Sequence, residues 1–508
     1  MPEYNDETKL TLGEATLVSL LRRGRAASQN QVLTGGFVFV YNGKRFEERM
    51  IVMTCQFGRR DFLRGLAYSG AGVSLSGMLS GCASFGGAYE DLTELRCPPI
   101  QKVRVGVIGL GMRGPGAVHH YSGIPGVEVT ALCDLLPERA ERQRNWLVQK
   151  KKPEPKVYAG REDSWKELCD SEDVDLVHIT TPWLLHAPQG VYALKAGKHA
   201  VSEVPCAVTL DECWELVETV EKTRRHFMML ENCCYGENEM FALSLCRNGV
   251  LGELFHGEAA YNHDLRSLQF ADLKGGGYQG MWRLNYNTEH TGNPYPTHGL
   301  GPVCQYMNIN RGDRFEYLTS ISSDEFGLRD YAARKFGPDS PEAKKKYALG
   351  DMNNTIIRTA KGRTILVQHD TSNARPYTRL NLIQGTRGIL SDYPLRVALE
   401  PDAERWMDEK KLAELKEKYA HPLWKKNGKA AVEHGGHGGM DYLLLRRLVY
   451  CLQNGQPLDI SVYDSALWCS LVELTEKSVL KRGASVEVPD FTRGAWKTAQ
   501  PLGLLDIG

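Results

Sequence analysis

A short apolar run that ends in a glycine-rich turn, residues 103–114, constrains the fold more than any other stretch of this chain. The run is rich in β-branched residues and predicts a buried strand: Val103, Val105, Val107 and Ile108. The turn has the spacing Gly109-x-Gly111-x-x-Gly114 and leads into a helical pattern. Glycines so spaced permit a tight turn, close approach of a pyrophosphate to the backbone and packing of helix on strand. The stretch predicts a nucleotide site at a helix N-terminus, and an ordinary glycine-rich turn is the alternative.

A second apolar run, residues 127–133, ends at Asp134, twenty residues after Gly114. A carboxylate at this point of a dinucleotide-binding fold accepts hydrogen bonds from the adenosine ribose and repels a 2′-phosphate. We therefore expect the cofactor to be NAD and not NADP.

The composition is that of a globular protein without a dominant charge. Lysine plus arginine and aspartate plus glutamate number 62 each, so there is no basic field to attract nucleic acid or an anionic membrane. With 508 residues the chain is too long for one hydrophobic core, and two domains with additional segments are expected. The 13 cysteines are scattered, which favours buried free thiols over a disulfide framework or a zinc site.

An export signal is predicted near the N-terminus. Residues 1–52 show no globular pattern, and Arg59-Arg60-Asp61-Phe62-Leu63-Arg64 resembles the twin-arginine motif. The Gly/Ala-rich stretch that follows is too short to span a bilayer but suits a signal-peptide core, and a buried helix is the alternative. It ends in Leu79-Ser80-Gly81-Cys82, which resembles a lipobox.

We therefore expect residues 1–52 to be a non-native extension, with translation beginning at Met50 or Met53. Residues 53–82 would form the signal and residues 83–100 a linker. The mature protein is expected in the periplasm after twin-arginine export, anchored to the membrane by a lipid on Cys82.

From residue 101 to 235 strands and helices alternate. Strands are predicted at residues 103–108, 127–133, 157–158, 174–181, 199–202 and 227–230, with helices at 137–150, 165–168, 187–196 and 210–223. This alternation predicts a doubly wound parallel sheet of the Rossmann type, with ligands beyond the carboxyl ends of the strands. Asp134, residues 183–186, Glu203 and Asn232 fall at those ends.

From residue 236 to 508 the pattern changes. Strands are predicted at residues 252–261, 317–322, 354–359, 364–369, 380–385 and 388–392, with helices at 240–247, 339–347, 408–418, 440–453 and 464–479. Strands so spaced predict a second α/β domain with an open, mainly antiparallel sheet.

The order of these elements resembles the Gfo/Idh/MocA family, in which a Rossmann domain precedes an α/β domain that carries a sugar. The resemblance rests on Gly109-Leu-Gly-Met-Arg-Gly114, Thr181-Pro182-x-x-x-His186, Glu203-Val-Pro205 and Gly252-Glu253. It implies cofactor contacts from Gly109, Gly111, Met112, Arg113, Gly114, Asp134, Trp183, Leu184, Leu185, His186, Glu203, Val204 and Asn232. Dehydrogenases of this family read Glu-Lys-Pro at the third motif, and their lysine helps the substrate hydroxyl lose its proton. Val204 cannot do so, which disfavours a plain sugar dehydrogenase.

Further motifs look like glycoside hydrolase family 109, the NAD-dependent α-N-acetylgalactosaminidases. They are Tyr261-Asn-His263-Asp264, Trp282-Arg283, Asn293-Pro-Tyr295-Pro-Thr-His298-Gly-Leu-Gly-Pro302, Asn373-Ala-Arg-Pro-Tyr377 and His434-Gly-Gly-His437-Gly-Gly-Met-Asp441. This resemblance implies hydrolysis of terminal α-linked N-acetylgalactosamine, with NAD as the cofactor and a glycan or glycoside as the substrate.

Ordinary glycosidases place two carboxylates across an oxocarbenium-like transition state, and the resemblance implies a different route. NAD⁺ takes a hydride from C3 of the sugar, and the resulting ketone acidifies the proton on C2. A base removes that proton, the group on C1 is expelled, water adds at C1, and the hydride returns without net redox change. Such a site needs acid–base groups and donors to the C3 oxygen.

The residues expected to act as acids and bases are Tyr261, His263, His298 and Glu231. Those expected to bind substrate are Tyr261, Arg283, Tyr295, Pro296, Thr297, His298 and Tyr377. Without the resemblance, Tyr261 and His263 would be the polar face of a strand, and His298 a structural histidine in a Pro/Gly loop. The glycines around His434 and His437 indicate close backbone approach before a helix, so no metal is expected.

Two other functions stay open. One is an exported NAD-dependent sugar oxidoreductase, against which Val204 argues. The other is a non-catalytic surface sugar binder with NAD as a structural ligand, against which the many Tyr, His and Arg residues of the second domain argue. No nucleic-acid partner is expected, membrane contact is expected only through Cys82, and a homo-oligomer is left open.

Overall fold

The computed structural model describes residues 92–272 and 277–507, and it confirms the predicted doubly wound sheet. Six parallel strands lie in the order β3-β2-β1-β4-β5-β6. They are β1 (Val103–Ile108), β2 (Val127–Asp134), β3 (Lys156–Ala159), β4 (Leu176–Ile179), β5 (His199–Ser202) and β6 (Phe227–Met229). β1 lies between β2 and β4 and is almost fully buried, which explains its run of β-branched residues.

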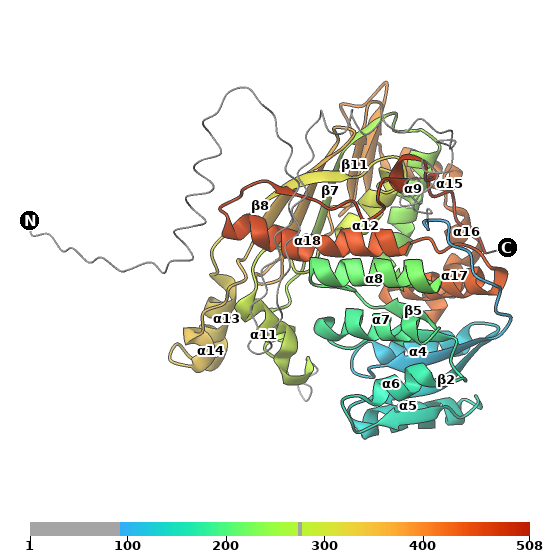
Figure 1. Cartoon of the computed structure of the whole chain (residues 1–508). Helices are drawn as coiled ribbons and strands as arrows, with labels where there is room; N and C mark the ends of the chain where they lie inside the picture. Colours follow the sequence, from blue (N-terminus) through green and yellow to red (C-terminus); the bar gives the residue numbers. More distant parts are fainter. Residues whose placement is uncertain (1–91, 273–276, 508) are drawn as a thin grey trace, which may run out of the picture. The chain divides into compact units, whose positions relative to one another are not determined.

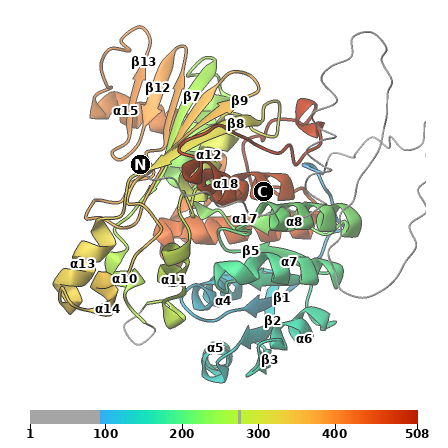
Figure 2. The ribbon, with the colours of Figure 1, turned by 60° about the vertical axis from the view of Figure 1, so that its left-hand side comes forward.

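Helices alternate with these strands (Figures 1 and 2). They are α4 (Gly114–Gly123), α5 (Pro137–Gln149), α6 (Ser164–Asp170), α7 (His186–Lys195) and α8 (Leu210–Thr223). The start of α8 is fixed by a capping box, in which the Thr209 hydroxyl accepts the N–H of Glu212 and the Glu212 carboxylate accepts the N–H of Thr209.

The second sheet is open and mainly antiparallel, as predicted. Its eight strands lie in the order β13-β12-β11-β7-β10-β9-β8-β14, and only β7 and β10 run parallel. They are β7 (Leu254–Asn262), β8 (Phe315–Ser322), β9 (Asn353–Thr359), β10 (Thr364–Asp370), β11 (Leu382–Gly385), β12 (Gly388–Ser391), β13 (Arg396–Leu399) and β14 (Val486–Glu487). Buried and exposed residues alternate along β9, so one face of the sheet is covered and the other is open.

Two helices, α12 (Thr297–Tyr306) and α18 (Val462–Leu480), cover the buried face of this sheet (Figure 2). α12 approaches β7 closely, because a Cβ at Gly299 would lie 2.3 Å from the Ala260 nitrogen. On the same helix, a Cβ at Gly301 would lie 3.0 Å from Cγ of Glu231, beyond the end of β6. The glycines of α12 therefore bring this helix against both the second sheet and the carboxyl edge of the first.

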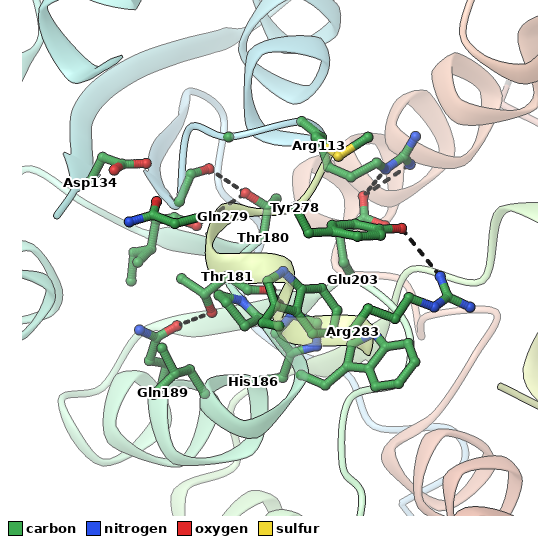
Figure 3. Close-up of a pocket in the computed structure, with 18 of the residues that line it drawn as sticks. Arg113, Asp134, Thr180, Thr181, His186, Gln189, Glu203, Tyr278, Gln279 and Arg283 are labelled. Atoms are coloured by element: carbon green, nitrogen blue, oxygen red, sulfur yellow. Dashed lines mark hydrogen bonds and ion pairs between the residues drawn. The ribbon is translucent and has the colours of Figure 1, made fainter. Parts of the chain in front are cut away.

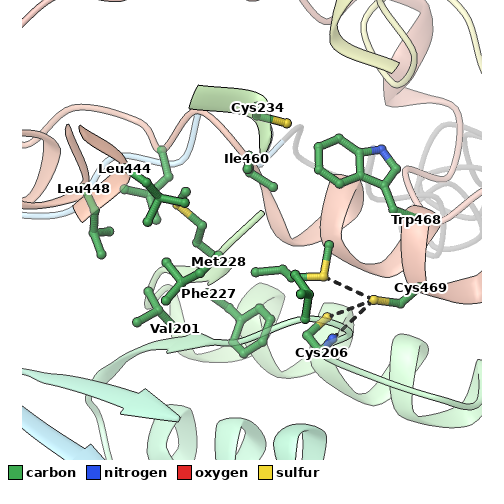
Figure 4. Packing of buried hydrophobic residues seen from close by; sticks show 14 of the residues in the cluster. Val201, Cys206, Phe227, Met228, Cys234, Leu444, Leu448, Ile460, Trp468 and Cys469 are labelled. Atoms are coloured by element: carbon green, nitrogen blue, oxygen red, sulfur yellow. Dashed lines mark hydrogen bonds between the residues drawn. The ribbon is translucent and has the colours of Figure 1, made fainter. Parts of the chain in front are cut away.

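α18 joins the two sheets, since it packs on β8 and also on α8 and β6 (Figure 1). Figure 4 shows the buried contact at this junction, where the Sγ atoms of Cys206 and Cys469 lie 3.5 Å apart beside Trp468. The apolar core runs without interruption from the first sheet to the second. The two sheets are therefore held in a fixed relation by shared packing.

The remaining helices include several that the sequence pattern did not reveal. Their bounds are η1 (Trp183–Leu185), η2 (Asn232–Tyr235), α9 (Glu237–Arg247), α10 (Arg266–Gln269), η3 (Gln279–Met281), α11 (Trp282–Glu289), α13 (Gly327–Phe336), α14 (Pro341–Lys344), α15 (Glu409–Lys418), α16 (Pro422–His434), η4 (His437–Gly439), α17 (Met440–Asn454) and η5 (Ala495–Lys497). The predicted helix at 339–347 was too long: in this stretch only α14 forms, and the backbone becomes extended at Lys345. α10, α11, α13 and α14 contribute to a separate small core around Phe270 and Leu328.

The segment before β1 packs against the folded unit. Leu92 and Cys97 are buried, and the N–H of Ile100 donates to the carbonyl of Leu452 over 2.9 Å. The predicted export signal and Cys82 lie outside the described residues. Among the described helices, none combines the length and apolarity needed to cross a membrane.

Candidate active site

A cavity of about 750 Å³ lies between the carboxyl edge of the first sheet and the second domain (Figure 3). Its lining includes most of the residues predicted for the cofactor: Gly109, Gly111, Met112, Arg113, Asp134, Trp183, Leu185, His186, Glu203, Val204 and Asn232. It also includes four residues predicted for the sugar: Tyr261, Arg283, Tyr295 and His298. The two predicted groups therefore face one continuous space.

The glycine-rich turn has the geometry that its spacing predicts. Gly109 has φ +89°, and a Cβ there would lie 2.9 Å from the Thr180 backbone at the end of β4. A Cβ at Gly114 would lie 2.0 Å from the Gly109 carbonyl oxygen, so only glycine lets α4 start this close to the turn. A Cβ at Gly111 would meet only the Arg139 side chain, and the backbone at Gly111 is open to the cavity. This arrangement leaves room for a pyrophosphate at the N-terminus of α4.

Asp134 ends β2 and holds the turn from the other side. Its carboxylate accepts the N–H groups of Leu110 (2.6 Å) and Leu136 (2.9 Å). Arg139 approaches the same carboxylate, with Nη1 3.7 Å from Oδ2. Each carboxylate oxygen can accept a further hydrogen bond, and Asp134 lines the cavity. The glycine turn, the helix N-terminus and this carboxylate together fit the pyrophosphate and ribose of NAD.

The segment after β4 forms the wall opposite Asp134. His186 is locked in place, because its ring nitrogens lie 2.7 Å from the Pro205 carbonyl oxygen and 2.6 Å from that of Thr181. Burial lowers the pKa of His186, while the two carbonyl oxygens beside its ring nitrogens act in the opposite direction. The Thr181 hydroxyl donates to Gln189 over 2.7 Å (Figure 3). This wall is therefore rigid.

A histidine–carboxylate pair stands at the sugar end of the cavity. His298, on the first turn of α12, places Nδ1 2.8 and 3.0 Å from the carboxylate oxygens of Glu231. Burial by itself would raise the pKa of Glu231, but its contacts with His298 bring the pKa below the usual value. Because a carboxylate only accepts hydrogen bonds, Nδ1 of His298 carries a proton, which in the neutral ring leaves the lone pair on Nε2. Nε2 lies 3.4 Å from the hydroxyl of Tyr295.

A second pair of the same kind stands near the cavity mouth. His437, in the glycine-rich segment before α17, has Nδ1 2.8 Å from Oδ2 of Asp441. Arg113 of the glycine turn donates to the same oxygen over 3.1 Å. It also donates to Glu203 over 3.0 Å (Figure 3). Burial would raise the pKa of Asp441, but His437 and Arg113 hold it well below its usual range. Asn232 donates to the other oxygen of Asp441 over 2.6 Å.

Tyr261 ends β7 with its hydroxyl 3.1 Å from Nδ1 of His263. Burial raises the pKa of Tyr261 to about 12, so the phenol keeps its proton at neutral pH. Burial lowers the pKa of His263, which is therefore uncharged under the same conditions. Tyr261 is thus a proton donor that faces the cavity, and His263 supports it from behind.

Arg283 brings a buried positive charge to the cavity without a carboxylate partner among the described residues. Its guanidinium lies 4.9 Å from the ring centres of both Trp183 and Tyr295. Nη1 of Arg283 donates to the Tyr278 hydroxyl over 3.3 Å, while Nε and Nη2 have no hydrogen-bond partner in the described part of the chain (Figure 3). Ring faces offset part of the cost of burying this charge. The free N–H groups are available to an oxygen of a ligand.

Some of the predicted residues do not line the cavity. These are Gly114, Leu184, Glu231, His263, Pro296, Thr297 and Tyr377, of which Leu184 is exposed and the others are buried or half-buried. Tyr377 packs edge-on against His263 with ring centres 4.9 Å apart. It accepts a hydrogen bond from Arg379, which in turn pairs with Glu239.

Several lining residues were missing from the predicted set. They are Arg139, Arg161, Thr181, Gln189, Tyr278, Gln279, Trp282 and His437. His437 was weighed only as a metal ligand, although its position in a glycine-rich segment three residues before α17 could have suggested a histidine presented at a helix N-terminus. The others come from helices and loops whose approach depends on tertiary packing.

Two family descriptions match this chain. "Glycosyl hydrolase 109, C-terminal domain" matches residues 235–498, and "Oxidoreductase family, NAD-binding Rossmann fold" matches residues 103–231. An alpha-N-acetylgalactosaminidase of Bacteroides fragilis is 49% identical over 401 residues, which is 79% of this chain and 94% of the relative. A glycosyl hydrolase family 109 protein of Shewanella pealeana is 46% identical over 460 residues, which is 89% of this chain and 99% of the relative.

Solved structures share the fold at lower sequence identity. A levoglucosan dehydrogenase in complex with NADH and levoglucosan has a TM-score of 0.58 at 21% identity, over 77% of this chain and all of that one. An aldose-aldose oxidoreductase from Caulobacter crescentus has a TM-score of 0.53 at 16% identity, over 76% of this chain. These likenesses establish the arrangement of the two domains.

Proposed function

This chain belongs to glycoside hydrolase family 109, and from that premise we propose that it removes terminal α-linked N-acetylgalactosamine from glycans. NAD is the cofactor, and it is restored at the end of each turnover. The observation that carries the proposal is the continuity of the cavity. The dinucleotide turn and the histidines of the two histidine–carboxylate pairs line the same space, so a sugar can meet the cofactor and the acid–base groups together.

When bound, NAD supplies reversible oxidation of the sugar at C3. The residues that hold it are the glycine turn from Gly109, Asp134 at the ribose, and the locked wall around His186. Val204 presents only an apolar surface to the cavity. The lack of a titratable side chain there favours the hydrolase over a sugar oxidoreductase of the same fold.

A carbonyl at C3 makes the hydrogen on C2 acidic, so the site must remove that proton. His298 is suited to this role, because Glu231 fixes its Nδ1–H and leaves the lone pair of Nε2 free. Its side chain is 14% exposed, which places it at the closed end of the cavity. His298 is therefore assigned as the base for the C2 proton.

Expulsion of the group on C1 requires a proton for the leaving oxygen. The rest of the glycan has to extend into solvent, so the acid that serves it must stand at the mouth. His437 meets this requirement, since its side chain is 59% exposed and Asp441 orients its ring. The flanking glycines Gly436 and Gly438, both with positive φ, let the loop present the ring in this way.

Arg283 and Tyr261 bind the sugar. The unpaired N–H groups of Arg283 match a carbonyl oxygen, such as that of an acetamido group, and the protonated Tyr261 donates to a sugar oxygen. Both lie beside Tyr295, whose ring centre is 4.6 Å from that of Tyr261. The three side chains together offer the sugar both apolar ring faces and hydrogen-bond donors.

The test uses the purified protein with its bound cofactor and a chromogenic α-N-acetylgalactosaminide. The proposal predicts release of the chromophore without accumulation of reduced nicotinamide, and turnover lowered about 10²–10⁴-fold in His298→Ala. Steady formation of reduced nicotinamide from free sugars, with no hydrolysis, would instead identify an oxidoreductase. Retention of the sugar with neither reaction would identify a binding protein.

We further propose export by the twin-arginine route and lipid anchoring at Cys82. The support is the order of Arg59-Arg60, an apolar stretch and Leu79-Ser80-Gly81-Cys82 in the sequence. Mass spectrometry of the native N-terminus in a membrane fraction tests this proposal. A lipidated mature chain that begins at Cys82 supports it, and loss of the anchor in Cys82→Ser provides the control. A mature chain that begins elsewhere contradicts it.

A further inference from the structure

A cysteine thiol that the proposed chemistry does not use lies beside the Glu231–His298 pair. Glu231, Cys233 and His298 each offer one ligand atom, and these atoms all lie within 4.8 Å of one another. We propose that the three side chains form a binding site for a thiophilic divalent cation of the Zn²⁺ class, and that the bound ion inhibits the enzyme. The inhibition rests on the proposed function, whereas binding of the ion does not.

The turn after β6 creates this arrangement. Glu231 caps η2, and its carboxylate accepts the N–H of Cys233 over 3.1 Å, which folds the acid back over the cysteine. His298 reaches the same carboxylate from α12. Glu231 and Cys233 are 0% and 2% exposed, so both donors are fixed by the surrounding core. The Cys233 thiol also makes a weak contact of 3.6 Å with Oδ1 of Asn232.

The donor set is one that zinc takes in proteins. Thiolate sulfur, imidazole nitrogen and carboxylate oxygen are its usual ligands, and three of them often leave a fourth position open. Bonds of roughly 2.0–2.3 Å place such ligands about 3–4 Å apart, so the three atoms here need only small side-chain shifts. His298 lines the cavity, and an ion together with a water ligand can enter from that side.

Binding exchanges protons for the ion. Cys233 releases its S–H proton to solvent and binds as thiolate. His298 loses the proton on Nδ1, which takes the ion, and gains one on Nε2. Nε2 then has no lone pair with which to accept the C2 proton of the sugar. The ion therefore removes the base of the reaction without blocking the cofactor.

A second group of donors in the described part of the chain provides a contrast. Cys97, His199 and His226 are also buried and also lie within 4.8 Å. However, Nδ1 of His199 accepts the N–H of His226 over 3.0 Å, so its other nitrogen carries the proton. His199 has no free lone pair for a metal ion, and this group is not expected to bind one.

The test uses the full enzyme with bound NAD, dialysed against ZnCl₂ or MgCl₂. Bound zinc is quantified by elemental mass spectrometry, and glycosidase activity is measured on the same samples. With ZnCl₂ we expect one bound zinc ion per chain, loss of glycosidase activity as the site fills, and recovery of activity after chelation. With MgCl₂ we expect no inhibition. Cys233→Ser should keep the zinc-free activity but raise the inhibition constant about tenfold or more, since even outer-shell partners contribute roughly 10–100-fold to metal affinity.

Cys234→Ser is the matched control, because Cys234 is the next residue, is equally buried, and directs its Sγ toward Gly301. It and Cys97→Ser should bind zinc as the parent does. If Cys233→Ser unfolds, Cys233→Ala is measured in its place. Absence of bound zinc, or equal zinc binding with and without the Cys233 thiol, overturns the proposal. An enzyme inactive without zinc contradicts the proposed function instead, and its zinc content still tests the site.

Discussion

The two ends of the cavity are built in different ways. The cofactor end is assembled from residues close together in the chain, since Gly109, Gly114 and Asp134 lie on one β–α–β unit. The backbones of Gly109 and Gly114 approach closely, and the Asp134 carboxylate accepts the N–H of Leu110. The sugar end combines side chains from the turn after β6, from β7, α11 and α12, and from the segment before α17. The first end is specified by local turn geometry and the second by packing between distant elements.

Because of this difference, substitutions at the two ends are expected to have different effects. A substitution at the cofactor end is expected to change how firmly NAD is held while leaving the acid–base groups in place. A substitution at the sugar end is expected to change turnover while leaving NAD bound. Each variant below tests this separation by measuring cofactor content and turnover on the same sample, in decreasing order of the effect on turnover.

The largest loss is expected from His298→Ala, which removes the base from the closed end of the cavity. Turnover should fall about 10²–10⁴-fold, as general acid–base groups contribute, with NAD content unchanged. His290→Ala is the matched control, because His290 also pairs with a glutamate, Glu476, but outside the cavity. Loss of NAD from His298→Ala, or turnover like that of the control, would contradict the separation.

His437→Ala should show a smaller loss that depends on the leaving group. Natural glycans leave poorly without a proton, so their hydrolysis should fall about 10²-fold or more, whereas an activated aryl glycoside should lose less than about tenfold. Comparing the two substrates at saturation measures this ratio. Equal losses for both substrates would show that His437 does not protonate the leaving oxygen.

Arg113 contacts residues at both ends of the cavity, so it should be an exception to this separation. Arg113→Met removes hydrogen bonds to Glu203 and Asp441, and we expect losses of about tenfold in both NAD affinity and turnover. Arg104→Met is the control, since Arg104 pairs with Asp175 at the opposite edge of the sheet. A variant that changes only one of the two quantities would assign Arg113 to that end alone.

The sequence specified the cofactor end almost completely because its constraints are local. Three glycines and a carboxylate at fixed spacing need no information about the rest of the fold, and the elements from β1 to α8 followed from their periodicity. The helix α12 was not anticipated, because Pro296, Gly299, Gly301 and Pro302 are typical of a loop. Those glycines serve instead to pack the helix on Ala260 and Glu231, which only the tertiary structure reveals.

The sugar end was anticipated in part and through the family resemblance. Tyr261, Arg283, Tyr295 and His298 do face the cavity, but the sequence could not show that Glu231 lies behind His298 or that Tyr377 lies behind His263. His437 was not predicted as an acid, because its partner Asp441 is oriented by Arg113 and Asn232 from the first domain. Contacts between domains do not produce a hydrophobic periodicity in the sequence of either segment, so sequence patterns could not reveal them.

The smallest effect on turnover is expected from Asp134→Ala. Leu110 and Leu136 lose the acceptor of their N–H groups, so the glycine turn loosens and purified protein should contain less NAD. At saturating NAD the turnover should stay within about twofold of the parent, because no group at the sugar end has moved. A loss of turnover that added NAD does not restore would place Asp134 in the chemistry.

Hydrogen at C2 of the sugar reports most directly on the mechanism. His298 is proposed to remove a proton from that carbon, a step that direct displacement by two carboxylates does not require. Hydrolysis in heavy water, followed by mass and nuclear magnetic resonance analysis of the released sugar, reports this event. We predict deuterium at C2 and none at C3 in the parent enzyme. Fast hydrolysis with only ordinary hydrogen at C2 would contradict the account.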